Sequence, residues 1–243
     1  MSYVFEPIGI VHSCFKEKFG IPRQAGLIPE AEGRLEILPA YNRVEAFREL
    51  ERYSHLWLTF VFHAAIREQW SPTVRPPRLG GNRRVGVFAS RSPFRPNPIG
   101  LSVVELRSLD QTQDGISLRL GGIDLLDQTP VLDIKPYLPY SDAIPGARAG
   151  FAPEAPARPI ELSLSEAADG FLGELESSQA DHLRRLIRQI LENDPRPAYL
   201  HANPGRQTYG MRLYDYNIRW RIEEGRLLIT SIVPIDDLNA EID

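Results

Sequence analysis

The chain has 243 residues and a net charge of −4, with 42% hydrophobic and 25% charged residues. These proportions are typical of a globular protein and exclude a disordered chain, a fibrous protein and, with Cys14 as the single cysteine, a disulfide scaffold. No apolar stretch is long enough to cross a bilayer, and the N-terminal residues lack the features of an export signal. We therefore expect a cytoplasmic protein of one or two domains, without a membrane partner.

Short β-prone runs separated by turns dominate the first 140 residues. We predict strands over residues 4–11, 34–38, 56–62, 85–89, 99–106, 116–120 and 131–134. A short amphipathic helix is predicted over residues 44–52, because Val44, Phe47 and Leu50 recur at every third position. Prolines and glycines indicate a long surface loop over residues 67–82. This recurrence of strands predicts a β-sandwich or a β-barrel.

The arginines are concentrated in one part of the sequence. Residues 67–95 contain seven arginines and one glutamate, so this segment carries a net charge of +6. Guanidinium groups pair with phosphates and carboxylates through two parallel hydrogen bonds, so the segment could bind such groups. A solvated basic loop would have the same charge, and charge alone does not separate the two interpretations.

The composition changes after residue 142. Residues 143–159 contain four prolines and two glycines among many alanines, which is typical of a linker and not of a regular element. We therefore predict a mainly β domain over residues 1–142 and a small α+β domain over residues 160–243.

The C-terminal region combines a helix with a hairpin. Residues 182–192 place their apolar side chains on one helical face. Two β-prone runs, residues 211–222 and 227–233, are joined by a glycine-containing turn and predict a hairpin. Four aromatic residues of this region could stack on unpaired RNA bases or pack in the core: Tyr209, Tyr214, Tyr216 and Trp220.

Carboxylates gather in the segment that contains the last predicted strand of the β domain. Asp124, Asp127 and Asp133 lie close to Lys135, although aspartate is unfavourable within strands. If residues 133–135 are extended, Asp133 and Lys135 project from the same face and can pair. The pair is either an ordinary surface ion pair or a base that a cation holds ionised.

Several familiar signatures are missing from the sequence. It contains no dinucleotide-binding glycine motif, no P-loop, no zinc-protease motif and no nucleophile elbow. The five histidines lack the spacing of a metal site, because even His55 and His63 would be about 26 Å apart on one straight strand. We therefore expect neither a Rossmann-type nucleotide site nor a metal.

Five ordered segments carry a family resemblance. They are Pro22-Arg23-Gln24-Ala25-Gly26, His55-Leu56-Trp57-Leu58, Arg75-Pro76-Pro77-Arg78-Leu79-Gly80-Gly81, residues 86–102 (GVFASRSPFRPNPIGLS) and residues 124–137 (DLLDQTPVLDIKPY). Together they resemble the TsaA-like family over most of residues 1–140. Residues 194–199 (DPRPAY) resemble a motif of the small C-terminal domain in the bacterial branch of that family. Two positions depart from the pattern: Ala25 stands where proline or serine is expected, and Gln128 where glycine is common.

The resemblance implies a fold, an activity and a cofactor. It implies a single-sheet β-barrel that binds S-adenosylmethionine, followed by the small α+β domain, in a homodimer. The implied activity is methylation of N6 of threonylcarbamoyladenosine next to the anticodon, with the tRNA anticodon stem-loop as partner. The cofactor contacts that it implies are Gln24, Ala25, Gly26, His63, Ala64, Arg91, Leu101, Ile123, Asp124, Leu125, Leu126 and Asp127.

The chemistry of methyl transfer suggests further roles. We expect Asp133 to act as a base, assisted by Lys135 and Tyr137, because the substrate N6 is a poor nucleophile until it loses its proton. Arg91 or Arg95 could hold the threonyl carboxylate. The predicted tRNA contacts are Arg75, Arg78, Arg83, Arg84, Arg95, Asn97 and Tyr216. The alternative is a β-barrel without catalysis, which binds RNA or senses S-adenosylmethionine.

Overall fold

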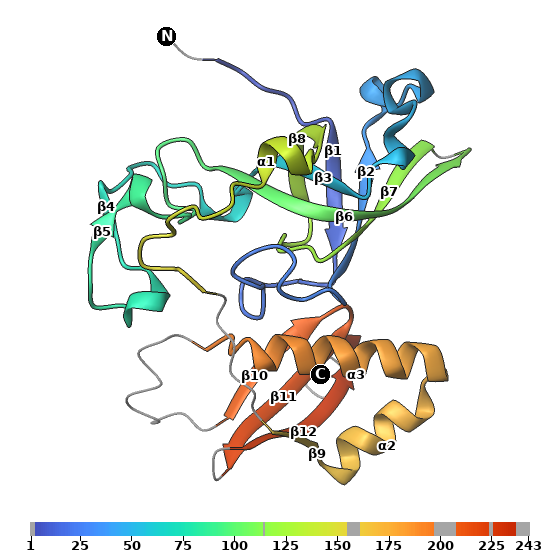
Figure 1. Cartoon of the computed structure of the whole chain (residues 1–243). Helices are drawn as coiled ribbons and strands as arrows, with labels where there is room; N and C mark the ends of the chain where they lie inside the picture. Colours follow the sequence, from blue (N-terminus) through green and yellow to red (C-terminus); the bar gives the residue numbers. More distant parts are fainter. Residues whose placement is uncertain (1–2, 114, 155–160, 197–207, 224–225, 237–243) are drawn as a thin grey trace.

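The computed structural model describes residues 3–113, 115–154, 161–196, 208–223 and 226–236. These residues form a barrel and a smaller α+β region below it (Figure 1). In the described ranges no helix is both long and apolar enough to cross a membrane.

Six antiparallel strands form the closed barrel. In barrel order they are β1 (Gly9–Ser13), β2 (Glu32–Ile37), β7 (Gly115–Gly121), β6 (Ile99–Thr112), β3 (His55–Val61) and β8 (Thr129–Pro136). Burial alternates along the strands, and in β3 Leu56, Leu58 and Phe60 point inward. The predicted mainly β fold with a barrel is confirmed, and closure leaves none of these six strands as a free edge.

The predicted helix over residues 44–52 is wrong in type. The chain instead forms short 3₁₀ helices, η1 (Pro39–Tyr41), η2 (Val44–Phe47) and η3 (Leu50–Arg52). Glu49, with φ of 69°, interrupts them. The three-residue spacing that suggested an amphipathic helix is also the period of a 3₁₀ helix.

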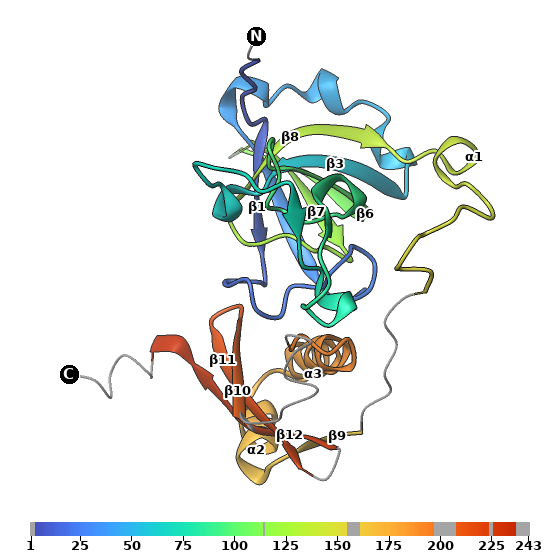
Figure 2. The same ribbon diagram turned by 90° about the vertical axis from the view of Figure 1, so that its left-hand side faces the viewer.

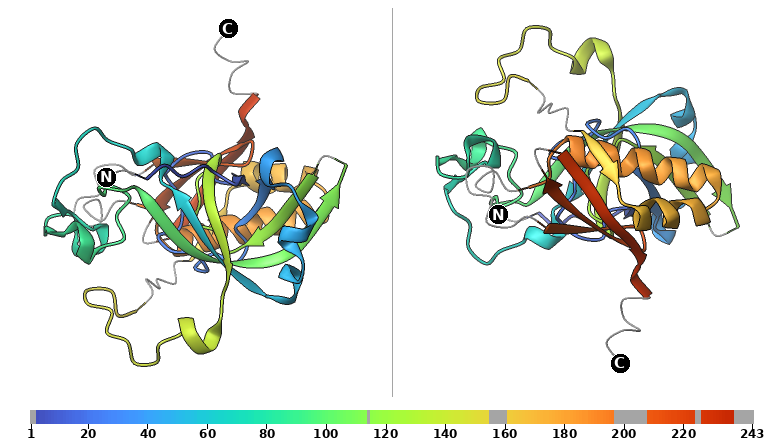
Figure 3. Two further views of the ribbon diagram at one scale, coloured as in Figure 1. Left: turned by 90° about the horizontal axis from the view of Figure 1, so that it is seen from above. Right: turned by 90° about the horizontal axis from the view of Figure 1, so that it is seen from below.

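The arginine-rich segment projects from one side of the barrel (Figures 1 and 3). It begins after η4 (His63–Ala65) and contains only two-residue strands, β4 (Thr73–Val74) and β5 (Val85–Gly86). Two 3₁₀ helices, η5 (Pro77–Leu79) and η6 (Val87–Ala89), complete it. The strand predicted over residues 85–89 therefore ends after two residues, and the predicted long loop is largely confirmed.

The C-terminal region is a four-stranded sheet with two helices. The sheet order is β10 (Thr208–Leu213), β11 (Tyr216–Glu223), β12 (Arg226–Pro234) and β9 (Leu162–Leu164). The helices are α2 (Glu166–Glu174) and α3 (Ser177–Glu192), and a single turn, α1 (Pro139–Asp142), precedes the region. The predicted helix is confirmed as part of α3, whereas α2 and β9 were not predicted. The division into domains at residues 142 and 160 stays a prediction, and residues 155–160 of the predicted linker lie outside the described ranges.

The strand predicted over residues 211–222 is instead two strands. Tyr214 and Asp215 form the turn between β10 and β11, and Tyr214 has a φ of 50°. Tyr214 is not a typical turn residue, and Asp215 alone was too weak a signal to predict a turn here. Residues 224–225, between β11 and β12, lie outside the described ranges.

Two of the four aromatic residues that could have bound RNA belong to the core. Tyr209 and Trp220 are buried and stack with their ring centroids 4.5 Å apart. The Tyr214 hydroxyl lies 3.1 Å from His182 Nε2, and the Tyr216 hydroxyl accepts a hydrogen bond from Gln179 at 3.1 Å. Core packing therefore explains the buried pair.

Helix α3 lies between the barrel and the C-terminal sheet, seen end-on in Figure 2. The chain after β1 reaches the same region, where Phe15 pairs with Leu213 and the backbone N–H of Tyr214 donates to the carbonyl of Cys14. Cys14 is fully buried, and this burial raises the pKa of its thiol to about 12. The buried apolar residues of the two regions form one continuous cluster.

Gly100 of β6 pairs with Phe60 of β3, and the lack of a side chain at Gly100 leaves room for the Phe60 ring. A Cβ atom at this position would lie 2.3 Å from Cζ of Phe60. We expect Gly100→Ala to lower the free energy of unfolding by about 1–3 kcal/mol, because the buried ring must move. Denaturant unfolding measures the change. Gly86→Ala is the matched control, since its Cβ would meet nothing within 4 Å, and equal losses in both variants would contradict the explanation.

Candidate active site

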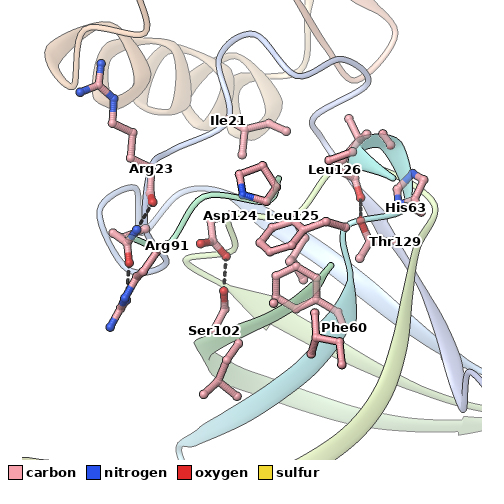
Figure 4. Close-up of a pocket in the computed structure, with 18 of the residues that line it drawn as sticks. Ile21, Arg23, Phe60, His63, Arg91, Ser102, Asp124, Leu125, Leu126 and Thr129 are labelled. Atoms are coloured by element: carbon pink, nitrogen blue, oxygen red, sulfur yellow. Dashed lines mark hydrogen bonds between the residues drawn. The ribbon is translucent and has the colours of Figure 1, made fainter. Parts of the chain in front are cut away.

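A cavity of about 590 Å³ lies at the end of the barrel that faces the C-terminal region. At this end β1, β3 and β7 finish and β2, β6 and β8 begin, so the loops that join them meet here (Figure 4). The lining residues are Lys18, Ile21, Pro22, Arg23, Gln24, Trp57, Phe60, Phe62, His63, Ala64, Ala65, Ser90, Arg91, Pro93, Phe94, Arg95, Ile99, Gly100, Leu101, Ser102, Asp124, Leu125, Leu126 and Thr129. The cavity thus gathers segments that are far apart in the sequence.

Most of the predicted cofactor contacts line this cavity. Those in its wall are Gln24, His63, Ala64, Arg91, Leu101, Asp124, Leu125 and Leu126. Ala25, Gly26, Ile123 and Asp127 are not part of the lining. Ile123 is fully buried in the core, and Asp127 points towards β1, where it accepts a hydrogen bond from the backbone of Ser13 at 2.8 Å and pairs with Lys16 at 2.9 Å. Burial opposes this ionisation, but Lys16 and the Ser13 N–H outweigh it and lower the pKa of Asp127.

Two glycines join the two chain segments that contain Gln24 and Asp124. The N–H of Gly26 donates to the carbonyl of Gly122 at 2.7 Å. Both residues have left-handed backbones, with φ of 77° and 63°. A Cβ at Gly122 would lie 3.3 Å from Cα of Gly26, so the two backbones are close. This contact holds residues 24–26 beside Asp124 although neither glycine faces the cavity.

Asp124 is the carboxylate of the cavity wall. Its Oδ1 accepts a hydrogen bond from the Ser102 hydroxyl at 2.7 Å (Figure 4). Burial raises the pKa of this carboxyl above its usual value, while Ser102, the backbone N–H groups of Asp124 and Ala25, and the charge of Arg91 act in the opposite direction. The neighbours of Asp124 therefore offset only part of the cost of burying its ionised carboxylate. A ligand that donates hydrogen bonds or carries a positive charge would stabilise this ionised form.

A polar relay lies close to Asp124 at the cavity edge. The guanidinium of Arg91 donates to the side-chain oxygen of Gln24, and the amide nitrogen of Gln24 donates to the carbonyl of Arg23 (Figure 4). This relay positions an exposed arginine at the cavity edge, where a fork of N–H groups can bind a carboxylate or a phosphate.

Aromatic rings form the apolar part of the wall. Phe60 and Phe62 meet edge to face with ring centroids 5.1 Å apart. The guanidinium of Arg67 lies 3.7 Å from the centroid of Phe94, which also lines the cavity. Such a wall suits a flat heterocycle or a sulfonium, since cations are attracted to ring faces. The cavity therefore combines aromatic rings with a carboxylate, Asp124, and an arginine, Arg91.

The predicted catalytic residues lie beside the cavity and not in its wall. Leu101, Thr59 and Asp133 form one row across β6, β3 and β8 on the outer face of the barrel. The predicted pair between Asp133 and Lys135 is confirmed. The ring of Tyr137 lies 6.0 Å from that of Trp57. Leu101 in this row lines the cavity, and Thr59 of β3 separates it from Asp133.

The predicted tRNA contacts are spread over three places. Arg95 lines the cavity and donates to the carbonyls of Ser90 and Ser92 at 3.2 and 3.3 Å. Tyr216 lies on β11, in the other region of the molecule. The remaining residues are exposed on or beside the projecting segment: Arg75, Arg78, Arg83, Arg84 and Asn97.

Several residues of the site were not predicted from the sequence. Ser102 binds Asp124, and it directly follows Leu101 in one of the motifs that carried the resemblance. Lys18 donates to the carbonyl of Ala64 at 2.6 Å and no motif indicated it. Trp70 and Phe88 are exposed on the projecting segment, with ring centroids 6.4 Å apart. Aromatic side chains interleaved with arginines were the available signal for this pair.

Comparisons with known proteins show which family the chain is similar to. Residues 10–143 match the family model described as the tRNA-methyltransferase O N-terminal domain, and residues 157–235 match the TrmO C-terminal domain. A tRNA (adenine(37)-N6)-methyltransferase of Escherichia coli is 47% identical, over 96% of this chain and 99% of its own. A putative S-adenosylmethionine-dependent methyltransferase of Pseudomonas aeruginosa is 50% identical, over 90% of this chain and 93% of its own.

The structural comparison leads to the same family. A crystal structure of TrmO from Pseudomonas aeruginosa has a TM-score of 0.75 and 42% sequence identity, and the match covers 96% of this chain and 99% of that one. The resemblance drawn from the sequence motifs is thereby confirmed. The chain belongs to the tRNA-methyltransferase O family.

Proposed function

We propose that this chain is an S-adenosylmethionine-dependent tRNA methyltransferase that acts on N6 of threonylcarbamoyladenosine next to the anticodon. The observation that carries the proposal is the cavity at the barrel end, where Asp124, Arg91 and aromatic rings face one space. The name of the Escherichia coli relative supports adenine at position 37 as the target base.

The activity is tested by incubating the purified protein with S-adenosylmethionine and tRNA that carries threonylcarbamoyladenosine. Mass spectrometry of the digested tRNA should detect that nucleoside with one added methyl group. The same tRNA with unmodified adenosine is the control. Cofactor binding without a methylated nucleoside would favour a sensor, and absence of cofactor binding would overturn the proposal.

The cavity residues have distinct roles in this proposal. When bound, S-adenosylmethionine supplies an electrophilic methyl group on its sulfonium. Asp124 accepts hydrogen bonds from donors of the cofactor, and Arg91 binds its carboxylate. Phe60, Phe62 and Phe94 enclose the apolar parts and keep water away from the reacting atoms. These roles position the reactants, which is the main requirement of a methyl transfer.

The outer face of β8 supplies the proton acceptor in this proposal. The lone pair of N6 is shared with the ring and with the carbamoyl group, so loss of the N6 proton makes it a better nucleophile. Asp133 accepts this proton, and the ammonium group of Lys135 pairs with its carboxylate. Arg95 at the cavity edge binds the threonyl carboxylate and distinguishes the modified base from plain adenosine.

The projecting segment is the surface that we assign to tRNA. Its exposed arginines contact phosphates of the anticodon stem-loop, and these contacts release counterions. Trp70 and Phe88 offer exposed rings among these charges, suited to unpaired bases. Tyr216 is retained as a more distant contact.

We further propose a homodimer that acts in the cytoplasm, where tRNA is available. The support for the dimer is the exposed apolar surface at the cavity mouth. Ile99 is 40% and Leu101 is 55% exposed, although both lie on β6, which pairs with a strand on each side. A second copy that covers these side chains would also shield the cavity from water.

The raised pKa of Asp124 makes cofactor affinity depend on pH. Since donors of the ligand favour the ionised carboxylate, binding lowers this pKa, and affinity should rise as pH increases through the pKa of the free protein. Calorimetry with S-adenosylmethionine at several pH values measures this. Asp124→Asn should weaken binding about tenfold or more and remove the dependence. Asp110→Asn, towards the far end of β6 in an ion pair with Arg119, should change neither, and an unaltered pH profile in Asp124→Asn would refute the role.

A substitution of Asp133 should distinguish an effect on methyl transfer from an effect on cofactor binding. Asp133→Asn should retain the affinity for S-adenosylmethionine, because the side chain is not in the cavity wall. The single-turnover rate of methyl transfer should fall about 10²- to 10⁴-fold. Rapid quenching followed by nucleoside mass spectrometry measures the rate. Transfer at the wild-type rate would show that another group accepts the proton.

A further inference from the structure

We infer that helix α3 of the C-terminal region positions the segment that carries Gln24 and Gly26, and so contributes to cofactor affinity without touching the cofactor. This inference rests on the proposed function of the cavity. Within the described ranges every residue that lines the cavity belongs to residues 18–129, so α3 must act through the barrel loop that it contacts.

Two hydrogen bonds connect α3 to the backbone of this loop. Gln189 accepts a hydrogen bond from the N–H of Glu30 through its side-chain oxygen, at 3.1 Å. Asn193 donates from its side-chain nitrogen to the carbonyl of Leu27 at 3.4 Å, and the same nitrogen donates to the carbonyl of Gln189 at 2.8 Å. The loop has no strand or helix of its own between residues 14 and 31, so these bonds replace part of the support that a regular element would give.

Charged groups strengthen the same contact. The carboxylate of Glu30 accepts a hydrogen bond from Arg185 at 2.8 Å and lies 3.1 Å from Nδ1 of His182. The other nitrogen of His182 lies 3.1 Å from the Tyr214 hydroxyl. Glu30 of the barrel loop thus contacts α3 directly, and His182 links it to the turn between β10 and β11.

Packing fills the rest of the contact. Ile28 on the loop and Ile190 on α3 are each 1% exposed and belong to the same buried cluster. Only a small cavity of about 40 Å³ remains between them, bordered by Arg23 and Asn193. In Figure 4 the Arg23 side chain leaves the large cavity and points towards α3. Residues 20–30 therefore have α3 on one side and the cofactor cavity on the other.

The barrel loop that α3 contacts also reaches the proposed cofactor site. The side chain of Gln24 is hydrogen-bonded to Arg91. The backbone of Gly26 is hydrogen-bonded to that of Gly122, two residues before Asp124. If α3 released the loop, these residues would sample more positions, and binding would then have to order them at an entropic cost. The expected result is weaker cofactor binding with an unchanged cavity composition.

Matched substitutions at Gln189 test the inference. Gln189→Met keeps the length of the side chain and removes the accepting oxygen, whereas Gln189→Glu keeps an oxygen. We expect the dissociation constant for S-adenosylmethionine to rise about 5- to 10-fold in Gln189→Met and to return close to the wild-type value in Gln189→Glu, which corresponds to the net value of about one hydrogen bond. Arg184→Ala, which removes contacts with Asp169 of α2 and with Asp181 of α3 but none with the barrel loop, should leave the constant unchanged.

Hydrogen exchange supplies a readout that does not require cofactor. In Gln189→Met the backbone amides of residues 20–31 should exchange faster, while those of β3 and β6 keep their rates. The KM for S-adenosylmethionine should rise and the KM for tRNA should stay constant. If exchange and cofactor affinity match those of Arg184→Ala, the inference is wrong. If the wild-type protein binds no S-adenosylmethionine although exchange changes as expected, the proposed function fails and the mechanical link between α3 and the loop stands.

Discussion

The hydrogen bond from Gly26 to Gly122 is the constraint on which the site depends. It joins two loops that are almost a hundred residues apart in the sequence. They lie at the barrel end where β1, β3 and β7 finish and β2, β6 and β8 begin. Both glycines adopt left-handed backbones that other residues adopt only at a cost. Because they meet there, the N–H of Ala25 faces the carboxylate of Asp124, and the loop with Gln24 lies beside Arg91. The electrostatics of the cavity follow from this backbone contact.

The strand order makes this meeting possible. In a closed antiparallel barrel the ends of neighbouring strands alternate, so every second connection emerges at the same end. Here these connections are the loop before β2, the turn after β3, the motif before β6 and the segment between β7 and β8. Nearly all of the segments that carry candidate site residues therefore lie at one end of the barrel. The C-terminal region lies against this same end, which places a second layer of support behind the cavity loops.

The sequence predicted those parts that depend on local pattern. The alternating strands and the helix over residues 182–192 follow from periodicity, and most of the predicted cofactor contacts that line the cavity lie in short motifs of the resemblance. Spacing alone could not separate a 3₁₀ helix from an α-helix at Val44, nor find a turn at Tyr214, because tertiary contacts hold these backbones. Gln128, which departs from the expected glycine, has a φ of 64°, so the family pattern reflects a backbone requirement that this chain meets with a side chain. That Asp127 points away from the cavity, and that α3 supports the loop, could be learned only from the three-dimensional arrangement.

The burial of Cys14 has a practical consequence for the study of this protein. Its thiol is enclosed by the core and stays protonated at neutral pH, so it is a poor target for alkylating reagents and oxidants. The sequence holds no other cysteine. A single thiol introduced at an exposed place, such as Gln69→Cys on the projecting segment, would therefore accept a fluorophore selectively, with the native residue left in place. Fluorescence changes of that label could then follow RNA arrival in real time.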